Sequence, residues 1–185
     1  MNKGSRVKLK RDLNEKLERV KAIFFDVDGV LTDGRIYLGQ REEAKAYSTK
    51  DGFGILIARE AGLKVFLVTG RSSASVTRRA GELGVKAFQN VEDKLLCVGR
   101  LCEKAGFKLR EAAFVGDDLN DLAVMRKVGV SFAVANAADE IKAIAHLTTS
   151  KNGGEGAARE VVEKILRSQG KWDETAKQFL CQKKP

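Results

Sequence analysis

KAIFFDVDGVLTDG, residues 21–34, joins a short apolar run to two aspartates and a glycine. Residues 22–25 are apolar at every position, which is typical of a strand buried on both faces of a parallel sheet. Asp26 and Asp28 follow directly, so two carboxylates stand where that strand should end. In open α/β sheets, ligands bind outside the carboxyl ends of the strands. The stretch therefore predicts a parallel sheet and a ligand site at its edge.

The rest of the chain repeats this rhythm of strand and helix. Further β-rich runs occur at residues 64–68, 86–89, 112–115 and 131–134. Helical patterns separate or follow them, at 54–61, 73–83, 93–105, 119–128, 138–145 and 156–169. Such alternation predicts an α/β fold with a doubly wound, Rossmann-like parallel sheet. Residues 30–50 break the rhythm with apolar patches at 35–39 and 45–49, which predict a projecting β-hairpin.

The length of 185 residues suits one domain with short flanking segments. Residues 1–20 are predicted to hold an amphipathic lead-in helix, at about 8–19, that packs on its own domain. Residues 21–170 form the predicted catalytic domain, and residues 171–185 a C-terminal tail.

Charge and composition narrow the function classes. The net charge of +9 suits nucleic acid, acidic lipid or small anionic substrates. However, no basic patch is interleaved with aromatic residues, so a nucleic-acid partner is not expected. The chain has no apolar signal core and no run of membrane-spanning length, which predicts a soluble, cytoplasmic protein without a membrane partner. Three cysteines without a CxxC pair favour neither a disulfide framework nor a zinc site.

Polar side chains follow each of the predicted strands that should lie side by side. Besides Asp26 and Asp28, the relevant segments are Thr69-Gly70-Arg71 after the second strand, Lys94 after the third, and residues 117–121 after the fourth. Because these strand ends share one edge of a parallel sheet, their side chains should converge.

The expected cluster favours phosphoryl transfer with a divalent cation. Asp26, Asp28 and Asp117 would repel one another unless a cation lay between them. Mg²⁺ prefers such oxygen ligands together with phosphate oxygens. Lys94 and Arg71 add positive charge, and Thr69 with nearby amides can hold phosphoryl oxygens. These elements predict a Mg²⁺-dependent phosphoryl-transfer site.

The spacing of the first two aspartates suggests different roles. Residues i and i+2 of an extended chain point to the same side. Asp26, on the metal, stays ionised and can attack phosphorus. Asp28, beside a second negative charge, is more easily kept protonated, so it can protonate the leaving oxygen and later activate water.

The ordered set DVDGVLTDG, VTGR, Lys94 and GDDLND resembles the haloacid dehalogenase-like phosphohydrolases. This resemblance implies that Asp26 is the nucleophile, that Asp28 is the general acid and base, and that Thr69 and Lys94 bind the phosphoryl group. It also implies that Asp26, the backbone carbonyl of Asp28, and Asp117 bind Mg²⁺. By the same resemblance Asp121 orients Lys94. Asp118, which lies close to the motif without a clear role of its own, is predicted to be a supporting residue.

Family members usually insert a cap domain, but the segments after the first and third strands leave no room for one, so a capless member is expected. Residues 20–175 more closely resemble the branch that contains the 3-deoxy-D-manno-octulosonate 8-phosphate (KDO 8-phosphate) phosphatases of lipopolysaccharide synthesis. That resemblance implies a sugar-acid phosphate as substrate, a homotetramer, and Arg71 and Arg79 on the sugar-acid carboxylate. Arg71 and Arg79 are eight residues apart, which would let both face one region of a helix.

Two smaller features receive weaker interpretations. Glycine-rich residues 153–156, GGEG, precede a predicted helix, where anions can bind. The resemblance places that loop near the site. Asp51 is predicted to be a helix cap close to the site.

Three alternatives stay open at this point. A related branch acts on nine-carbon sialic-acid-type phosphates, and the sequence separates the two branches poorly. The charge of +9 also motivates a phosphatase acting on nucleic-acid ends. A non-catalytic, tetramer-forming module is the third, although the intact catalytic set argues against it.

Overall fold

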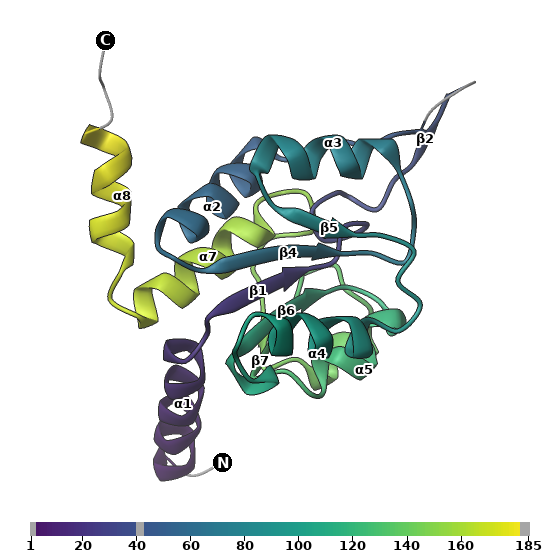
Figure 1. Ribbon diagram of the computed structural model, residues 1–185. Coiled ribbons are helices and arrows are strands. Elements are labelled where there is room, and N and C mark those ends of the chain that lie inside the picture. Colours follow the sequence, from purple (N-terminus) through teal and green to yellow (C-terminus); the bar gives the residue numbers. More distant parts are fainter. Residues whose placement is uncertain (1–2, 40–42, 182–185) are drawn as a thin grey trace.

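The computed structural model describes residues 3–39 and 43–181, and a six-stranded parallel sheet forms its centre (Figure 1). The strand order is β5-β4-β1-β6-β7-β8. The strands are β1 (Ala22–Phe25), β4 (Lys64–Val68), β5 (Lys86–Phe88), β6 (Ala112–Gly116), β7 (Val130–Ala133) and β8 (Leu147–Thr148). The doubly wound α/β prediction is confirmed, and all five predicted strands are present. The short edge strand β8 was not predicted.

The direction of winding reverses beside β1. The chain runs from β1 to β4 and β5 on one side, and then returns to β6 on the other side of β1. Such a reversal is a topological switch point, where the connecting chains diverge and leave a crevice at the carboxyl ends of the strands. Asp26 lies directly after β1, so the fold places it at this crevice.

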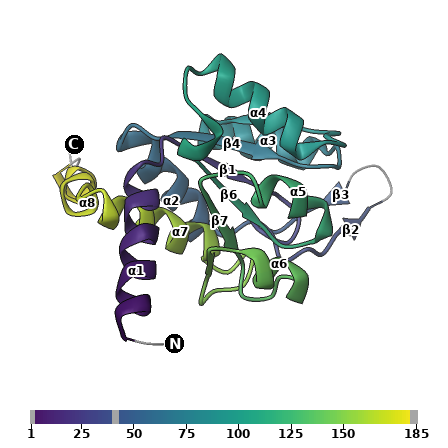
Figure 2. The ribbon, with the colours of Figure 1, turned by 90° about the horizontal axis from the view of Figure 1, so that it is seen from below.

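Helices cover both faces of the sheet. They are α2 (Thr49–Glu60), α3 (Ala74–Leu83), α4 (Lys94–Lys104), α5 (Leu122–Met125), α6 (Asp139–Ile144) and α7 (Ala157–Ser168), with 3₁₀ turns η1 (Leu109–Glu111) and η2 (Leu119–Asp121). Figure 2 shows α4 and α7 on opposite sides of the sheet. Apolar side chains of β1 and β6 are fully buried between these layers, as their unbroken apolar sequences predict.

Two predicted helices differ in extent from those observed. Helix α2 begins at Thr49 rather than 54, because the Ser48 side chain accepts a hydrogen bond from the Asp51 N–H and caps the helix. The predicted helix at 119–128 is the 3₁₀ turn η2 followed by one short helix, α5.

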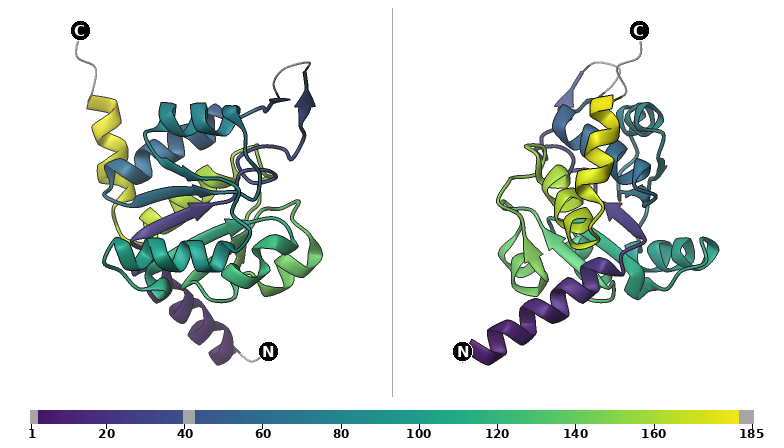
Figure 3. Two further views of the ribbon diagram at one scale, coloured as in Figure 1. Left: turned by 45° about the vertical axis from the view of Figure 1, so that its right-hand side comes forward. Right: turned by 90° about the vertical axis from the view of Figure 1, so that its left-hand side faces the viewer.

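The terminal segments are helical and extend from the domain (Figure 3). Helix α1 (Lys3–Glu18) contains the predicted lead-in helix, and Leu17 is buried against the core. Helix α8 (Trp172–Cys181) occupies a region where only a tail was predicted. Trp172 is buried, and the Arg159 guanidinium lies 4.8 Å from its ring centroid. The proposed domain boundaries at residues 20 and 170 stay a prediction.

A hairpin is present as predicted, but its second strand is residues 43–44 rather than the predicted patch at 45–49. Strands β2 (Tyr37–Leu38) and β3 (Glu43–Ala44) pair antiparallel and project beyond the sheet edge (Figure 1). Part of its turn, residues 40–42, lies outside the described residues. Tyr37 and Leu38 are 52% and 84% exposed. Within residues 3–39 and 43–181 the structure has no cap domain, and no helix there is long and apolar enough to cross a membrane.

Candidate active site

Asp26, Lys94, Asp117 and Asp121 meet at the carboxyl ends of β1 and β6. Asp26 stays attached to the sheet, since its N–H donates to the Val115 carbonyl at 3.0 Å. Asp26, Asp117 and Asp121 offer carboxylate oxygens that all lie within 4.8 Å of one another. The convergence expected from the strand ends is therefore observed for these side chains.

Lys94 is the positive centre of this cluster. Its Nζ lies 3.0 Å from Asp26 Oδ1 and 2.6 Å from Asp121 Oδ1. Lys94 is the first residue of α4, and the Asp93 side chain caps that helix by accepting from the Leu96 N–H. Burial would lower the pKa of Lys94, but the charges of Asp26 and Asp121 outweigh it and raise the pKa. Lys94 is therefore a fixed cation.

Asp121 holds other residues of the site in position. Its Oδ1 pairs with Lys94, and its Oδ2 accepts a hydrogen bond from the Asp117 N–H at 3.0 Å. Both oxygens are thus engaged, and the residue is fully buried. This geometry suits the predicted role of Asp121 in orienting Lys94.

Lys94 alone does not neutralise the negative charges of the Asp26 and Asp117 carboxylates. Burial, and then the charge of Asp121, raise the pKa of Asp26 to about 7. Burial, and then the charges of Asp26 and Asp121, raise the pKa of Asp117 to about 8. A single lysine cannot balance the cluster, and a divalent cation beside Asp26 and Asp117 would relieve the repulsion. The donor set, all carboxylate oxygen, suits Mg²⁺.

Gly29 allows Asp117 to reach this position. Gly29 has φ of +85°, and a Cβ on it would lie 1.9 Å from Asp117 Oδ2. Only glycine satisfies both the left-handed backbone and this close approach. The glycine that follows the two aspartates is therefore part of the site.

Asp28 lies in a different charge environment from its neighbour. The Lys45 ammonium contacts Asp28 Oδ1, and Arg71 Nε lies 3.7 Å from Asp28 Oδ2. The sequence argument for a protonated Asp28 relied on a second negative charge beside it. In the structure these contacts are instead cations from the hairpin and from the end of β4, so that argument does not describe this side chain.

The catalytic cavity has a volume of about 250 Å³. Its lining includes the predicted residues Asp26, Asp28, Thr69, Gly70, Arg71, Asp117 and Asp118, together with Gly34 and Asn120. Thr69 is buried, and its hydroxyl oxygen accepts from the Arg71 N–H at 3.3 Å. Asp118 caps η2 by accepting from the Leu119 N–H.

Arg79 does not line this cavity. Its guanidinium donates to the Ser48 carbonyl at 3.3 Å, pairs with Glu82 at 3.2 Å, and borders a separate cavity with Lys45 and Tyr47. The helical-spacing argument fails because α3 begins at Ala74, so Arg71 is not on that helix. Within one chain, Arg71 and Arg79 thus face different cavities.

Sequence reasoning missed Lys45, Glu43 and Asn120. Glu43 begins β3 and Lys45 directly follows that strand, two positions further along, which can place both side chains on one side. That alternation was the available signal, but nothing in the sequence says which side faces the site.

The GGEG loop, residues 153–156, packs against Gly29 and Val30, which directly follow Asp28. The Gly154 N–H donates to the Val30 carbonyl at 2.9 Å, and a Cβ on Gly153 would lie 1.7 Å from the Gly29 carbonyl oxygen. Asp51, buried at the start of α2, accepts from the N–H groups of Gly156 and Arg159 at the start of α7. These contacts hold α2, α7 and the residues after β1 together.

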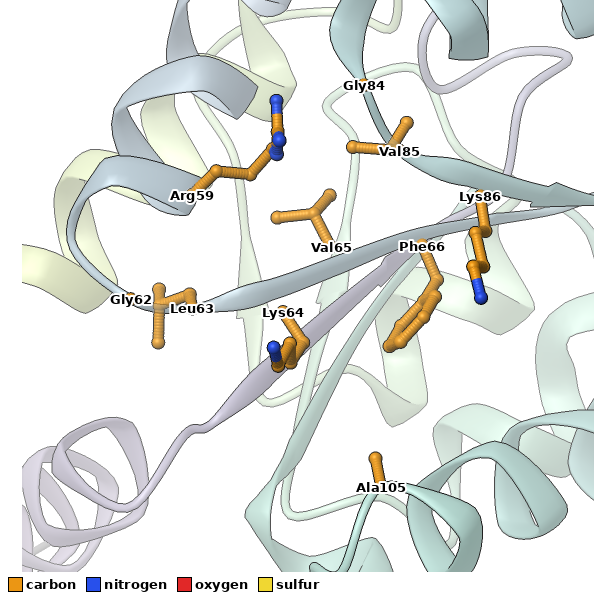
Figure 4. Close-up of a pocket in the computed structure, with 10 residues that line it drawn as sticks. All are labelled: Arg59, Gly62, Leu63, Lys64, Val65, Phe66, Gly84, Val85, Lys86 and Ala105. Carbon is orange, nitrogen blue, oxygen red and sulfur yellow. The ribbon is translucent and has the colours of Figure 1, made fainter.

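A larger cavity of about 670 Å³ lies at the opposite ends of β4 and β5 (Figure 4). Arg59, Lys64 and Lys86 border it, and its lining includes no acidic side chain. Lys64 begins β4, whereas Thr69 follows its end, so this cavity lies away from the carboxylate cluster.

Comparisons with known proteins identify the family of this chain. Residues 89–161 match the haloacid dehalogenase-like hydrolase family. The chain is 41% identical over 171 residues to 3-deoxy-D-manno-octulosonate 8-phosphate phosphatase KdsC of Escherichia coli, which covers 91% of each chain.

Two solved structures share the fold. That of 3-deoxy-D-manno-octulosonate 8-phosphate phosphatase from Moraxella catarrhalis, in complex with magnesium, phosphate and KDO, has a TM-score of 0.88 and 38% identity, covering 91% of this chain and 98% of that one. The cobalt-bound phosphatase of Haemophilus influenzae has a TM-score of 0.85 and 38% identity, covering 89% and 99%.

Proposed function

We propose a function for this chain, which belongs to the 3-deoxy-D-manno-octulosonate 8-phosphate phosphatase family of haloacid dehalogenase-like hydrolases. It is a Mg²⁺-dependent phosphoric monoester hydrolase that acts on KDO 8-phosphate. The observation that carries the proposal is the position of Asp26. Its carboxylate lies at the switch point of the sheet, 3.0 Å from Lys94 and within 4.8 Å of Asp117 and Asp121. Lipopolysaccharide synthesis as the pathway and a cytoplasmic location are implied by the resemblance and belong to the proposal.

Asp26 and Asp117, with the backbone carbonyl of Asp28, would hold Mg²⁺. The structure supports this fit, because burial and then the charges of neighbouring carboxylates raise the pKa of Asp26 to about 7 and that of Asp117 to about 8. When bound, Mg²⁺ supplies the charge that keeps both carboxylates ionised and neutralises phosphoryl oxygens. Asp121 is engaged by Lys94 and the Asp117 N–H, so it is assigned a supporting role.

In the first step Asp26 acts as nucleophile. A carboxylate oxygen of Asp26 forms a bond to phosphorus, and the bond between phosphorus and the sugar oxygen breaks with its electron pair going to that oxygen. Asp28 delivers a proton to the leaving sugar oxygen. Thr69 and Gly70, which line the cavity, and Lys94, whose Nζ lies 3.0 Å from Asp26, would bind the transferring phosphoryl oxygens.

In the second step the phosphoaspartyl group is hydrolysed. Asp28, now a carboxylate, takes a proton from water while the water oxygen attacks phosphorus. The bond between phosphorus and Asp26 breaks, which regenerates the Asp26 carboxylate and releases inorganic phosphate. Each residue returns to its starting protonation state, so the cycle balances.

Arg71 is proposed to recognise the carboxylate of the sugar acid. It lines the catalytic cavity, and its side chain is 53% exposed, so its guanidinium is accessible to an entering ligand. Arg79 lies outside that cavity of the same chain, so its predicted contact with substrate is not supported by geometry within one chain.

A homotetramer is also part of the proposal. The projecting hairpin exposes Tyr37 and Leu38, and an apolar projection of this kind favours self-association. A neighbouring subunit would then cover a site that has no cap within the described part of the chain.

A substrate screen with Mg²⁺ tests the activity. It should include KDO 8-phosphate, a nine-carbon sugar acid 9-phosphate, a hexose phosphate, a mononucleotide and a 5′-phosphorylated oligonucleotide. We expect KDO 8-phosphate to give the highest kcat/KM, and the Asp26→Asn protein to give no turnover. A preference for the nine-carbon sugar acid 9-phosphate would instead assign the enzyme to the related branch that acts on nine-carbon sialic-acid-type phosphates. Absence of activity on every phosphate ester would refute the phosphatase assignment.

A further inference from the structure

Asp28, Lys45, Glu43 and Arg71 form a closed ring of alternating charges beside the catalytic cavity, which Asp28 and Arg71 line. Lys45 contacts Asp28 and lies 3.5 Å from Glu43. Arg71 lies 3.0 Å from Glu43 and 3.7 Å from Asp28. Glu43 and Lys45 come from the hairpin, Asp28 follows β1 and Arg71 follows β4. The ring therefore connects the hairpin to the residues that follow these two strands.

Lys45 is the fixed member of this ring. Its side chain is 0% exposed, although lysine is almost never fully buried unless it is paired. Removing an ammonium from water is costly, and the two carboxylates of Asp28 and Glu43 compensate for that cost. A lysine that merely solubilised the hairpin would instead extend its ammonium into water.

The two oxygens of Asp28 have unequal surroundings. Oδ1 is held by the Lys45 ammonium, whereas Oδ2 is buried and accepts no hydrogen bond within the described part of the chain. The only cation of the ring beside Oδ2 is Arg71, at 3.7 Å, and the Arg71 side chain is half exposed. Arg71 is therefore the member that can leave when a ligand enters, while Lys45 keeps its hold on Oδ1.

We propose that Lys45, supported by Glu43, is a positioning residue for Asp28. Lys45 fixes Oδ1 and thereby presents Oδ2 to the leaving sugar oxygen in the first step and to water in the second. The inference rests on the proposed phosphatase function, in which Asp28 transfers these protons. It assigns Lys45 and Glu43 no direct contact with the phosphoryl group.

The leaving group separates this role from a structural one. An alkyl phosphate such as KDO 8-phosphate needs a proton on its leaving oxygen, whereas p-nitrophenolate leaves without one. Lys45→Met keeps the length of the side chain and removes its charge. Single-turnover rates should then fall about tenfold to a hundredfold for KDO 8-phosphate, since misplacing a catalytic group by about 1 Å costs up to that much. Release of p-nitrophenolate should change little, and KM for either substrate should stay near the wild-type value.

A double-mutant comparison tests whether Lys45 acts through Asp28. In an Asp28→Asn background the proton transfer is already lost, so adding Lys45→Met should cause no further loss with the alkyl substrate. Lys50→Met, which removes an exposed lysine on α2, serves as the matched control and should behave as wild type. If Lys45→Met does not fold, Glu43→Gln takes its place, because it keeps the size of the side chain that holds Lys45.

The outcomes are distinct. A selective loss with KDO 8-phosphate that disappears in the Asp28→Asn background supports the inference. Equal losses on both substrates, or losses that add to that of Asp28→Asn, overturn it and show that Lys45 serves the fold or the phosphoryl group. If the wild-type protein prefers another alkyl phosphate, the same comparison applies to that ester, so failure of the substrate assignment is separable from failure of this inference.

Discussion

Replacement of Gly29 by alanine should reduce catalytic activity by displacing Asp117, in addition to lowering the stability of the fold. Gly29 has φ of +85°, and its new Cβ would lie 1.9 Å from Asp117 Oδ2, whereas Cβ atoms essentially never approach other atoms within 3.0 Å. Asp117 must therefore move by about 1 Å, and a displacement of that size at a catalytic site costs roughly a hundredfold in rate. The left-handed backbone adds a conformational cost of about 1–2 kcal/mol to folding.

Gly62 provides the matched control for this prediction. Its φ is +86°, but nothing lies within 4 Å of a Cβ built on it. Gly62→Ala should therefore carry the same conformational cost of about 1–2 kcal/mol and leave the site intact. Thermal unfolding should show similar losses for both variants, while kcat/KM and the Mg²⁺ dependence of the rate should change only for Gly29→Ala. If the two variants kept equal activity, the placement of Asp117 as a metal ligand held against Gly29 would be wrong.

Other predictions concern specificity, metal dependence and assembly. Arg71→Ala should lower kcat/KM for KDO 8-phosphate about tenfold to a hundredfold more than for p-nitrophenyl phosphate, since a lost bond to a charged group costs about 1.5–3 kcal/mol; equal losses would remove Arg71 from carboxylate recognition. EDTA should abolish turnover, and Ca²⁺ should restore it poorly because it accepts longer ligand distances; full activity in metal-free buffer would contradict the metal assignment. The pKa values of Asp26 and Asp117 are raised from 3.8 to about 7 and about 8. Protonation of these two carboxylates therefore stabilises the folded, metal-free protein at low pH, and this stabilisation is lost as the pH rises from 3.8 through about 7 and about 8. The melting temperature gained on adding Mg²⁺ to the metal-free protein should thus be larger near about pH 8 than near about pH 5, and a constant gain would refute this. Light scattering should report a homotetramer; a stable, fully active monomer would exclude one.

The sequence was most informative where local pattern and global topology impose the same result. Unbroken apolar runs at residues 22–25 and 112–115 identify strands that are buried on both faces, and both are strands in the structure. The rule that ligands bind at the carboxyl ends of parallel strands then brings together Asp26, Lys94 and Asp117. Asp26 and Asp117 could be placed because each directly follows a strand, whereas Lys94 is the first residue of α4 and lies six residues beyond the end of β5.

Prediction failed where long-range packing decides the structure. The predicted helix began at residue 54 and left Gly52 outside it, yet both Gly52 and Gly54 lie in α2, where a Cβ on Gly54 would meet the Arg159 Cα of α7 at 2.9 Å. Those glycines permit close helix packing rather than a turn. Strand β8 has two residues, too few to show a pattern, and α8 packs through Trp172 against Arg159.

The hairpin contribution to the site was not accessible from sequence. Lys45 looks like a surface charge at the end of the predicted hairpin, and its burial against Asp28 depends on how that end of the hairpin packs beside the residues that follow β1. Arg79 shows the converse error, because a numerical spacing was applied across the boundary between a loop and α3. Both cases involve side chains whose direction is set by contacts between distant elements.

Trapping the phosphoenzyme tests the central claim, that Asp26 is the nucleophile. Asp28→Asn and p-nitrophenyl phosphate should be combined, because the first step then needs no proton donor while the second lacks its base. We predict a burst of one p-nitrophenolate per active site, followed by slow turnover. Acid quenching, borohydride reduction and peptide mass spectrometry should locate the modification at Asp26. Turnover without a burst, or a modification at any other residue, would contradict the account.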